Sequence, residues 1–129
     1  MKRALSVPVL ISALLMVGGA VHAHHSAAGT YLFDKKITIK GTVAQLLYRN
    51  PHSYLKVDAK DSNGQTIRWS GEWGSVGELA VGKVTRDSLK TGDQVELTGN
   101  PGRTDSAHVV LILKLVRPSD GWQWESARK

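Results

Sequence analysis

Residues 53–82 decide the fold, and they read SYLKVDAKDSNGQTIRWSGEWGSVGELAVG. The first seven alternate between polar and apolar side chains, which is typical of a strand with one buried face. The apolar face of this strand consists of Leu55, Val57 and Ala59. Asp61–Gly64 predicts a tight hairpin turn, because Asn-Gly readily adopts the positive φ angles that such a turn needs. The stretch therefore begins with one arm of a β-hairpin.

The second arm and a short helix complete this stretch. Residues 65–72 return as a strand, with Ile67 and Trp69 expected to face inward. Ser75–Val81 then predicts a helix, because Ser75 can cap it and Glu78 follows at the capping-box spacing. Gly82 can end the helix.

Three further strands are predicted outside the hairpin. Residues 36–48 alternate between apolar and polar side chains, and Asn50-Pro51 ends this strand. Gly41 within it permits a bulge or bend. Residues 94–98 follow Gly92-Asp93, and residues 107–116 form the last and longest strand. That last strand is apolar on both faces. One face is expected to hold Val109, Leu111, Leu113 and Leu115, and the other Val110, Ile112 and Val116.

Five strands with a helix between the third and the fourth predict an all-β fold, a small OB-like barrel. A β-sandwich is the alternative, but it usually needs seven or more strands. The chain of 129 residues fits one such domain, placed at residues 24–129. We expect an irregular N-terminal arm before the barrel and an aromatic tail, with Trp122 and Trp124, after it.

Residues 1–23 have the pattern of a secretory signal peptide. A basic start precedes an apolar run over residues 4–17, and Val21-His22-Ala23 places small residues where signal peptidase requires them. The apolar run is shorter than the roughly 20 residues that a transmembrane helix needs. We therefore expect cleavage after Ala23, a periplasmic or secreted protein and no membrane span after cleavage; an uncleaved anchor is the alternative.

Composition narrows the classes of function. The chain has no cysteine, which excludes disulfides, iron–sulfur clusters and thiol nucleophiles. Cleavage would remove Lys2 and Arg3 and lower the formal net charge from +6 to +4. The basic residues are scattered, so a solvated surface is the simpler interpretation and an anionic lipid the alternative. Nucleic acid is not an expected partner of an exported protein.

The predicted mature chain would begin with His24-His25. A terminal amine has a pKa near 8 and loses its proton readily to a metal, so the amine and Nδ1 of His24 can chelate one ion. A further imidazole would complete a three-nitrogen site of the kind that suits Cu(II). Candidates for it are His25, His52 and His108. The alternative is that the paired histidines only begin a soluble arm.

Two residues of the hairpin are further binding candidates. Glu72 stands on the N-terminal side of the predicted helix, where negative charge is favoured, or it serves as a carboxylate ligand or partner of His52. His52 itself follows the stiff Asn50-Pro51 pair. Either this stiffness fixes His52 as a ligand, or the three residues form a turn whose side chains cap backbone groups. Trp69 is either a core residue or a platform for a ligand.

The residues favour a binding protein over an enzyme. Neither a Gly-x-Ser-x-Gly elbow nor a phosphate-binding loop is present. We expect metal binding, with copper first, and keep a non-enzymatic module that binds an envelope protein or glycan as the alternative. A copper-dependent redox enzyme ranks third, because a small barrel leaves little room for a deep pocket.

An ordered set of short motifs resembles DUF6152, a family of small secreted bacterial proteins of unknown function. The motifs are His24-His25-Ser26, Phe33-Asp34, Gly41, Asn50-Pro51-His52, Trp69-Ser70-Gly71-Glu72 and the stretch from Gly92 to Pro101. Tyr48 departs from the pattern, since the family often has Trp there. The resemblance covers nearly all of the predicted mature chain and implies export and a β fold, without implying an activity.

Overall fold

The computed structural model describes residues 27–128. Residues 27–30 form a helical turn, and the β unit, described by itself here, begins at Tyr31. Its elements, in chain order, are β1 (Ile37–Leu47), β2 (Tyr54–Lys60), β3 (Thr66–Glu72), α2 (Val76–Val81), β4 (Gln94–Pro101), η1 (Asp105–Ala107), β5 (Val109–Arg117) and β6 (Trp122–Glu125). The predicted signal peptide lies outside the described residues, as do His24 and His25.

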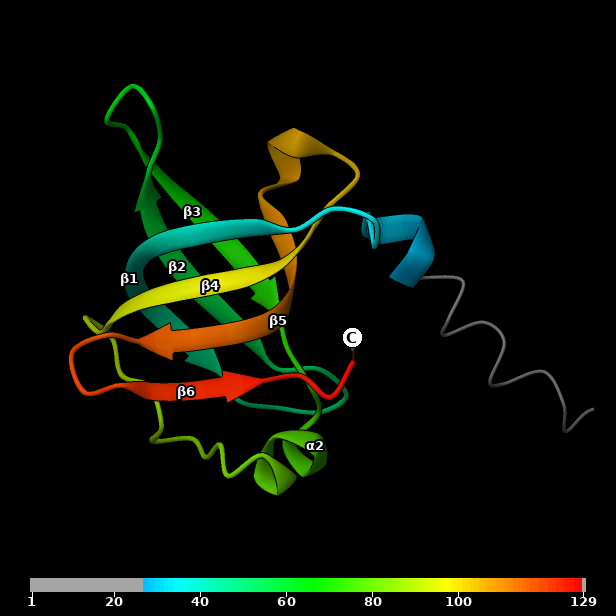
Figure 1. Ribbon diagram of the computed structural model, residues 1–129, viewed down its shortest axis with the longest axis vertical. Coiled ribbons are helices and arrows are strands. Elements are labelled where there is room, and N and C mark those ends of the chain that lie inside the picture. Colours follow the sequence, from blue (N-terminus) through cyan, green and yellow to red (C-terminus); the bar gives the residue numbers. More distant parts are fainter. Residues whose placement is uncertain (1–26, 129) are drawn as a thin grey trace, which may run out of the picture. The chain divides into compact units, whose positions relative to one another are not determined.

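Five strands close into a barrel, as predicted (Figure 1). β1 pairs antiparallel with β2 on one edge and with β4 on the other. β2 continues to β3 and β4 continues to β5, both antiparallel. A short parallel pairing of Ser70–Glu72 with Val109–Leu111 joins β3 to β5 and completes the circle. This is the strand order of an OB-like barrel.

Two glycines allow neighbouring strands to approach closely. A Cβ at Gly41 would lie 2.3 Å from the carbonyl oxygen of Asp58, and one at Gly99 would lie 2.1 Å from that of Leu111. Such distances leave no room for a side chain. The bulge in β1 falls between Val43 and Gln45 rather than at Gly41, so Gly41 serves close packing and not the bulge.

The expected faces of β5 are wrong. Val110, Ile112 and Leu115 are the residues of β5 that lie in the core. A bulge explains the change of face, because Thr98 pairs with Lys114 while Gly99 pairs with Ile112, so Leu113 is the extra residue. Strict alternation over the whole strand, which the sequence analysis assumed, is therefore interrupted at Leu113.

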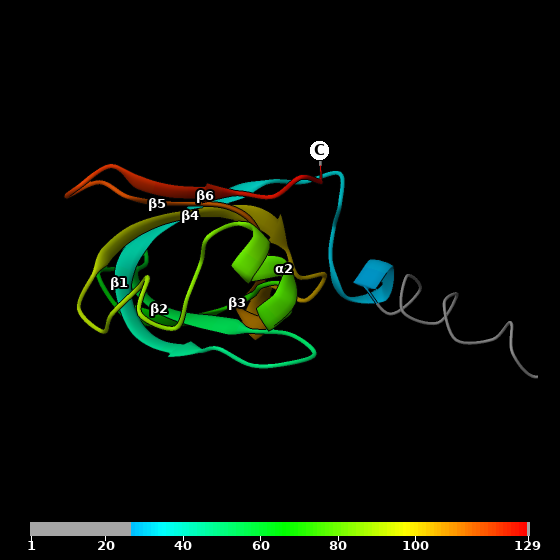
Figure 2. The same ribbon diagram turned by 90° about the horizontal axis from the view of Figure 1, so that it is seen from below.

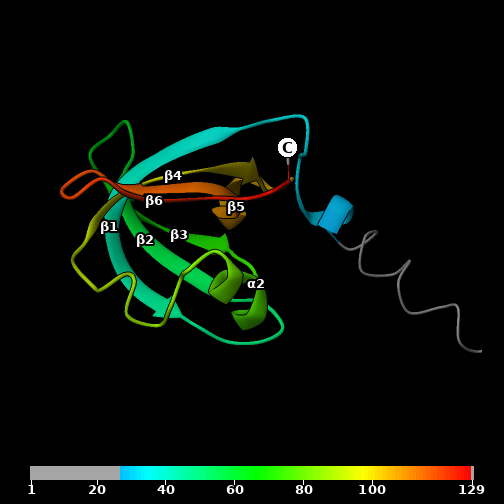
Figure 3. The same ribbon diagram turned by 60° about the horizontal axis from the view of Figure 1, so that its bottom comes forward.

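The helix closes one end of the barrel (Figures 1 and 2). The predicted capping box is present: Ser75 Oγ accepts from the backbone N–H of Glu78, and Glu78 Oε2 accepts from that of Ser75. Leu79 is fully buried in the core cluster. The long connection from α2 to β4 wraps beside this end of the barrel (Figure 3).

A sixth strand, which the sequence analysis did not predict, follows the barrel strands. β6 pairs with residues 114–117 of β5, whereas β3 pairs only with residues 109–111 of the same strand. β6 therefore occupies the part of the β5 edge that β3 does not reach. Its two tryptophans are partly buried against the core, and Trp124 meets Trp73 edge to face at 5.2 Å. The aromatic tail thus seals the seam of the barrel.

Among residues 27–128, no helix has the length and apolar character needed to cross a membrane.

Candidate functional site

The loop between β1 and β2 is locked at both ends. Ser53 is fully buried, and its hydroxyl exchanges hydrogen bonds of 3.1 Å with the backbone N–H and carbonyl of Arg49. Asn50 Oδ1 accepts from the backbone N–H of Val76 at 2.9 Å, so the loop also caps the start of α2. The peptide bond between Asn50 and Pro51 is cis. The hydrogen bonds of Ser53 and Asn50 anchor the loop that carries His52.

One nitrogen of His52 is fixed by a carboxylate. Nδ1 of His52 lies 2.9 Å from Oε1 of Glu72, at the end of β3. The imidazole is 51% exposed and the Glu72 side chain 20% exposed. Within the described part of the chain, Nε2 has no hydrogen-bond partner. A neutral His52 that donates from Nδ1 therefore keeps the Nε2 lone pair available to a ligand.

Tyr31 holds the same carboxylate from the other side. Its hydroxyl donates to Oε2 of Glu72 at 2.5 Å, a length typical of an O–H···O⁻ bond to a charged acceptor. The residue is only 4% exposed. Burial, with the Glu72 hydrogen bond and charge behind it, raises the pKa of Tyr31 far above its ordinary value, so the phenol stays protonated and donating. We call Tyr31, His52 and Glu72 the His52 site.

Cationic and aromatic side chains border the His52 site. Tyr54 is the strand partner of Glu72, and the Arg49 guanidinium lies 5.5 Å from the centre of the Tyr54 ring. Burial and then the Glu72 charge raise the pKa of Tyr54, and Arg49 opposes them. Lys56 also lies over the ring at 5.8 Å and donates to Ser70 Oγ. Two cations therefore lie over the Tyr54 ring.

The two interpretations of Glu72 resolve in favour of His52. The helix-end role falls to Glu78, whose pKa is lowered by hydrogen bonds from the backbone and hydroxyl of Ser75. Glu72 instead bridges His52 and Tyr31. The capping interpretation of the Asn50-Pro51-His52 turn is confirmed, because Asn50 caps the helix. His52 meets the carboxylate, and its role as a ligand stays a prediction.

The structure does not bring together all of the residues that the metal hypothesis needs. The His108 ring packs edge-on against Trp69 at 5.2 Å, and its buried Nδ1 has no hydrogen-bond partner among the described residues. Trp69 packs partly buried against the core. Within residues 27–128, no group of three or more His, Asp or Glu side chains is placed to hold a metal ion.

The sequence analysis missed Tyr31, which is a member of the site, and Arg49, which borders it. The apolar run Tyr31-Leu32-Phe33 within a polar arm was the available signal for an anchored segment. Tyr31 forms an isolated bridge with Gly102, and Leu32 donates to the Pro101 carbonyl. Part of the expected irregular arm is therefore bound to the barrel.

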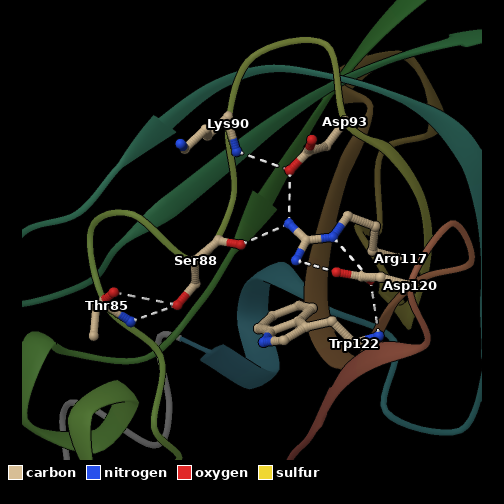
Figure 4. Close-up of polar contacts among 7 residues, drawn as sticks. All are labelled: Thr85, Ser88, Lys90, Asp93, Arg117, Asp120 and Trp122. Carbon is tan, nitrogen blue, oxygen red and sulfur yellow. Dashed lines mark hydrogen bonds and ion pairs between the residues drawn. The ribbon is translucent and has the colours of Figure 1, made fainter.

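A second polar cluster lies around Arg117 at the end of β5 (Figure 4). Its guanidinium donates to Asp93 Oδ2 at 2.9 Å, to both carboxylate oxygens of Asp120 and to the Ser88 carbonyl at 2.8 Å. The Trp122 ring lies 5.6 Å from it. These contacts tie the connection before β4 to the turn between β5 and β6. We call this set the Arg117 cluster.

The fold and the His52 site together define a small OB-like barrel with a carboxylate-anchored histidine at one loop. Residues 13–111 match the model of a family of unknown function, DUF6152, and the chain belongs to that family. The predicted family resemblance is confirmed. A search of curated proteins finds no match to this chain.

Proposed function

We propose that this DUF6152 protein is an exported metal-binding protein that takes Cu(II) first and uses His52 as one fixed imidazole ligand. The observation that carries the proposal is the 2.9 Å contact between His52 Nδ1 and Glu72 Oε1. Histidines that ligate metals almost always donate their other ring N–H to a carboxylate, carbonyl or water. Glu72 thereby fixes the orientation of the ring.

Chain length supports His24 as the partner of His52. With cleavage after Ala23, His24 would stand seven residues before Tyr31. Seven residues span at most about 25 Å when extended, and less across the turn at residues 27–30. Tyr31 and His52 bind the same carboxylate.

The proposed ligands are the terminal amine and Nδ1 of His24 together with Nε2 of His52, with His25 or His108 as the alternative source of the third nitrogen. Three nitrogens in a flat arrangement match the preference of Cu(II), which also has the highest affinity in the divalent series. Such a site stores or carries copper, and this proposal requires no enzymatic step.

The test uses mature protein purified from the envelope fraction, whose intact mass reports whether His24 is the first residue. Calorimetric Cu(II) titration is expected to give one site per chain, and paramagnetic resonance is expected to show nitrogen hyperfine structure. His24→Ala and His52→Ala should each weaken binding by at least tenfold. Asp58→Asn is the matched control. Asp58 lies on β2, the strand of Tyr54, and its carboxylate pairs with Arg68 of β3.

Two results would overturn the proposal. One is a wild-type protein without stoichiometric copper, and the other is a His52→Ala variant with unchanged affinity. A metal-free protein that instead recovers an envelope protein or a glycan from extract would support the interaction module predicted as the alternative.

A further inference from the structure

The outer face of the β2–β3 hairpin carries cations that no carboxylate neutralises. Side chains 54, 56, 58 and 60 of β2 point outward, because residues 55, 57 and 59 between them are buried in the core. Arg68 of β3 is neutralised by Asp58 through two hydrogen bonds of 2.7 and 2.8 Å. Within the described residues, by contrast, Arg49, Lys56 and Lys60 form no ion pair with a carboxylate.

Glu72, the other carboxylate of this face, is already engaged. It lies across the strand pair from Tyr54, but its Oε1 meets Nδ1 of His52 and its Oε2 accepts from the Tyr31 hydroxyl. The charges of Arg49 and Lys56 are therefore available to an anion from outside the protein.

The ring of Tyr54 holds these two cations in place. The Arg49 guanidinium lies 5.5 Å from the ring centre and the Lys56 ammonium 5.8 Å, and Lys56 also donates to Ser70 Oγ at 2.6 Å. Cations attracted to an aromatic ring are already partly ordered, so less side-chain entropy is lost when an anion binds them. We call Arg49, Tyr54 and Lys56 the Tyr54 patch.

The Tyr54 hydroxyl adds a hydrogen-bond donor to the patch. It has no hydrogen-bond partner in the part of the chain that the structure describes. Burial and then the charge of Glu72 raise the pKa of Tyr54, so the phenol stays protonated and can donate to an oxyanion.

A polar groove continues the same face at the other end of β2. Its volume is about 470 Å³, and Asp58 and Lys60 line it from β2. Further lining groups are the hydroxyls of Thr42 and Thr66 and the amide of Gln94. Hydroxyl, amide and ammonium groups are the hydrogen-bond partners that sugar hydroxyls need.

The composition of this face favours a hydrophilic polyanion. The large hydrophobic side chains that are exposed in the described residues are Phe33 and Val81, and both lie outside β2 and β3. The face therefore lacks the apolar centre of a protein interface and the apolar anchor of a membrane-bound surface. Single exposed ion pairs are weak, so tight binding requires a ligand that carries several charges.

We propose that the outer face of β2, from the Tyr54 patch to the groove at Lys60, binds an acidic polysaccharide. Carboxylates of its uronic acid units meet Arg49 and Lys56, and its hydroxyls bind in the groove. The planar fork of an arginine suits a carboxylate well. This site needs no metal ion, so the inference is independent of the function proposed above.

The experiment measures binding of polygalacturonate to the protein purified from the envelope fraction, by calorimetry in the presence of a chelator. Arg49→Gln/Lys56→Gln is expected to weaken the affinity at least tenfold. Wild-type affinity should fall as salt is raised, because salt screens exposed charges. Neutral dextran should not bind.

Arg86→Gln/Lys90→Gln is the matched control and should keep the wild-type affinity within twofold. It removes the same charge from the connection between α2 and β4. It also removes an equivalent contact, because Arg86 lies 5.5 Å from the centre of the Tyr48 ring.

Nuclear magnetic resonance of the wild-type protein gives a second test that needs no variant. Polygalacturonate should shift the amide signals of β2 and β3 more than those of residues 82–93. Larger shifts in residues 82–93 would contradict the proposal.

Three further results would overturn the proposal. They are absence of binding at low salt, equal loss of affinity in the two double variants, and tighter binding of polyglutamate or of phosphatidylglycerol vesicles than of polygalacturonate. A protein that binds copper but not polygalacturonate would remove this inference alone, and one that binds polygalacturonate but not copper would remove only the proposed metal binding.

Discussion

The Arg117 cluster and the His52 site use the same chemistry in opposite ways. In the Arg117 cluster one cation faces two carboxylates and a backbone carbonyl, and the Arg117 side chain is only 18% exposed. In the His52 site one carboxylate faces a phenol and an imidazole, and the imidazole is half exposed. Each guanidinium nitrogen of Arg117 donates to a group of the protein. By contrast, Nε2 of His52 has no hydrogen-bond partner among the described residues.

This difference distinguishes a polar cluster with a structural role from the site to which we assign binding in our proposal. Arg117 ties together two segments that lie outside the strands, namely the connection ending at Asp93 and the turn containing Asp120. The backbone around His52 is fixed by other residues, among them Ser53 and Asn50. Removing Arg117 should therefore damage the fold, and removing His52 should damage only binding.

The largest expected effect is on folding. Arg117→Met keeps an aliphatic side chain but removes the guanidinium, which lies over the Trp122 ring. Asp93 and the Ser88 carbonyl then lose one donor each. Hydrogen bonds to charged groups contribute roughly 1.5–3 kcal/mol, so the free energy of unfolding should fall by about 2–3 kcal/mol. Urea denaturation measures it. Copper affinity at 25 °C should not change. A variant with the wild-type free energy of unfolding that no longer binds copper would contradict the structural role of Arg117.

The next effect is on binding. Glu72→Gln replaces the anionic partner of His52 while keeping the shape of the side chain. Loss of such a partner typically weakens metal affinity by about 10–100-fold, which corresponds to roughly 1.4–2.7 kcal/mol. The urea midpoint should move far less than in Arg117→Met. Calorimetric titration of both variants beside the wild type checks this, and a Glu72→Gln protein with full affinity would remove the anchoring role of Glu72.

A smaller effect is expected from acid. Hydrogen bonds from the Lys90 backbone and from Arg117 hold the pKa of Asp93 below its ordinary value, and Arg117 does the same for the pKa of Asp120. For carboxyls of this kind the unfolded chain binds more protons, so their stabilisation is present above the ordinary pKa near 4 and is lost as the pH falls through the folded values. Unfolding free energy measured from pH 5 to pH 2 should fall less steeply in Arg117→Met than in the wild type. Equal slopes would show that the cluster does not set the acid sensitivity.

The barrel was predictable because its elements carry local signals. Asn63-Gly64 marks the hairpin turn, and Gly64 has the positive φ of 77° that was expected there. Ser75 and Glu78 mark the start of the helix, and both reciprocal hydrogen bonds are present. In these places local preference and tertiary structure agree, so the pattern alone gives the correct element.

The errors fall where the barrel closes. The bulge at Leu113 depends on how β4 and β5 meet, and β6 exists because β3 covers only part of the β5 edge. Neither fact is local. The His52–Glu72 pair was within reach of sequence analysis as one of two alternatives, whereas the Tyr31 contact joins residues 41 positions apart and depends on the path of the arm.

The smallest expected effect tests whether charge alone stabilises the outer strand. Lys114 and Glu125 pair between β5 and β6 at 3.9 Å, with 43% and 71% of their side chains exposed. Exposed single pairs contribute little, because water screens them and long side chains lose entropy. Glu125→Gln should therefore change the unfolding free energy by less than about 0.5 kcal/mol in urea, at low and at high salt alike. The contrast with Arg117 lies in geometry, since Arg117 binds Asp120 through two parallel hydrogen bonds and also meets Asp93. A salt-dependent loss above 1 kcal/mol in Glu125→Gln would instead show that β6 is held by charge and not by its tryptophans.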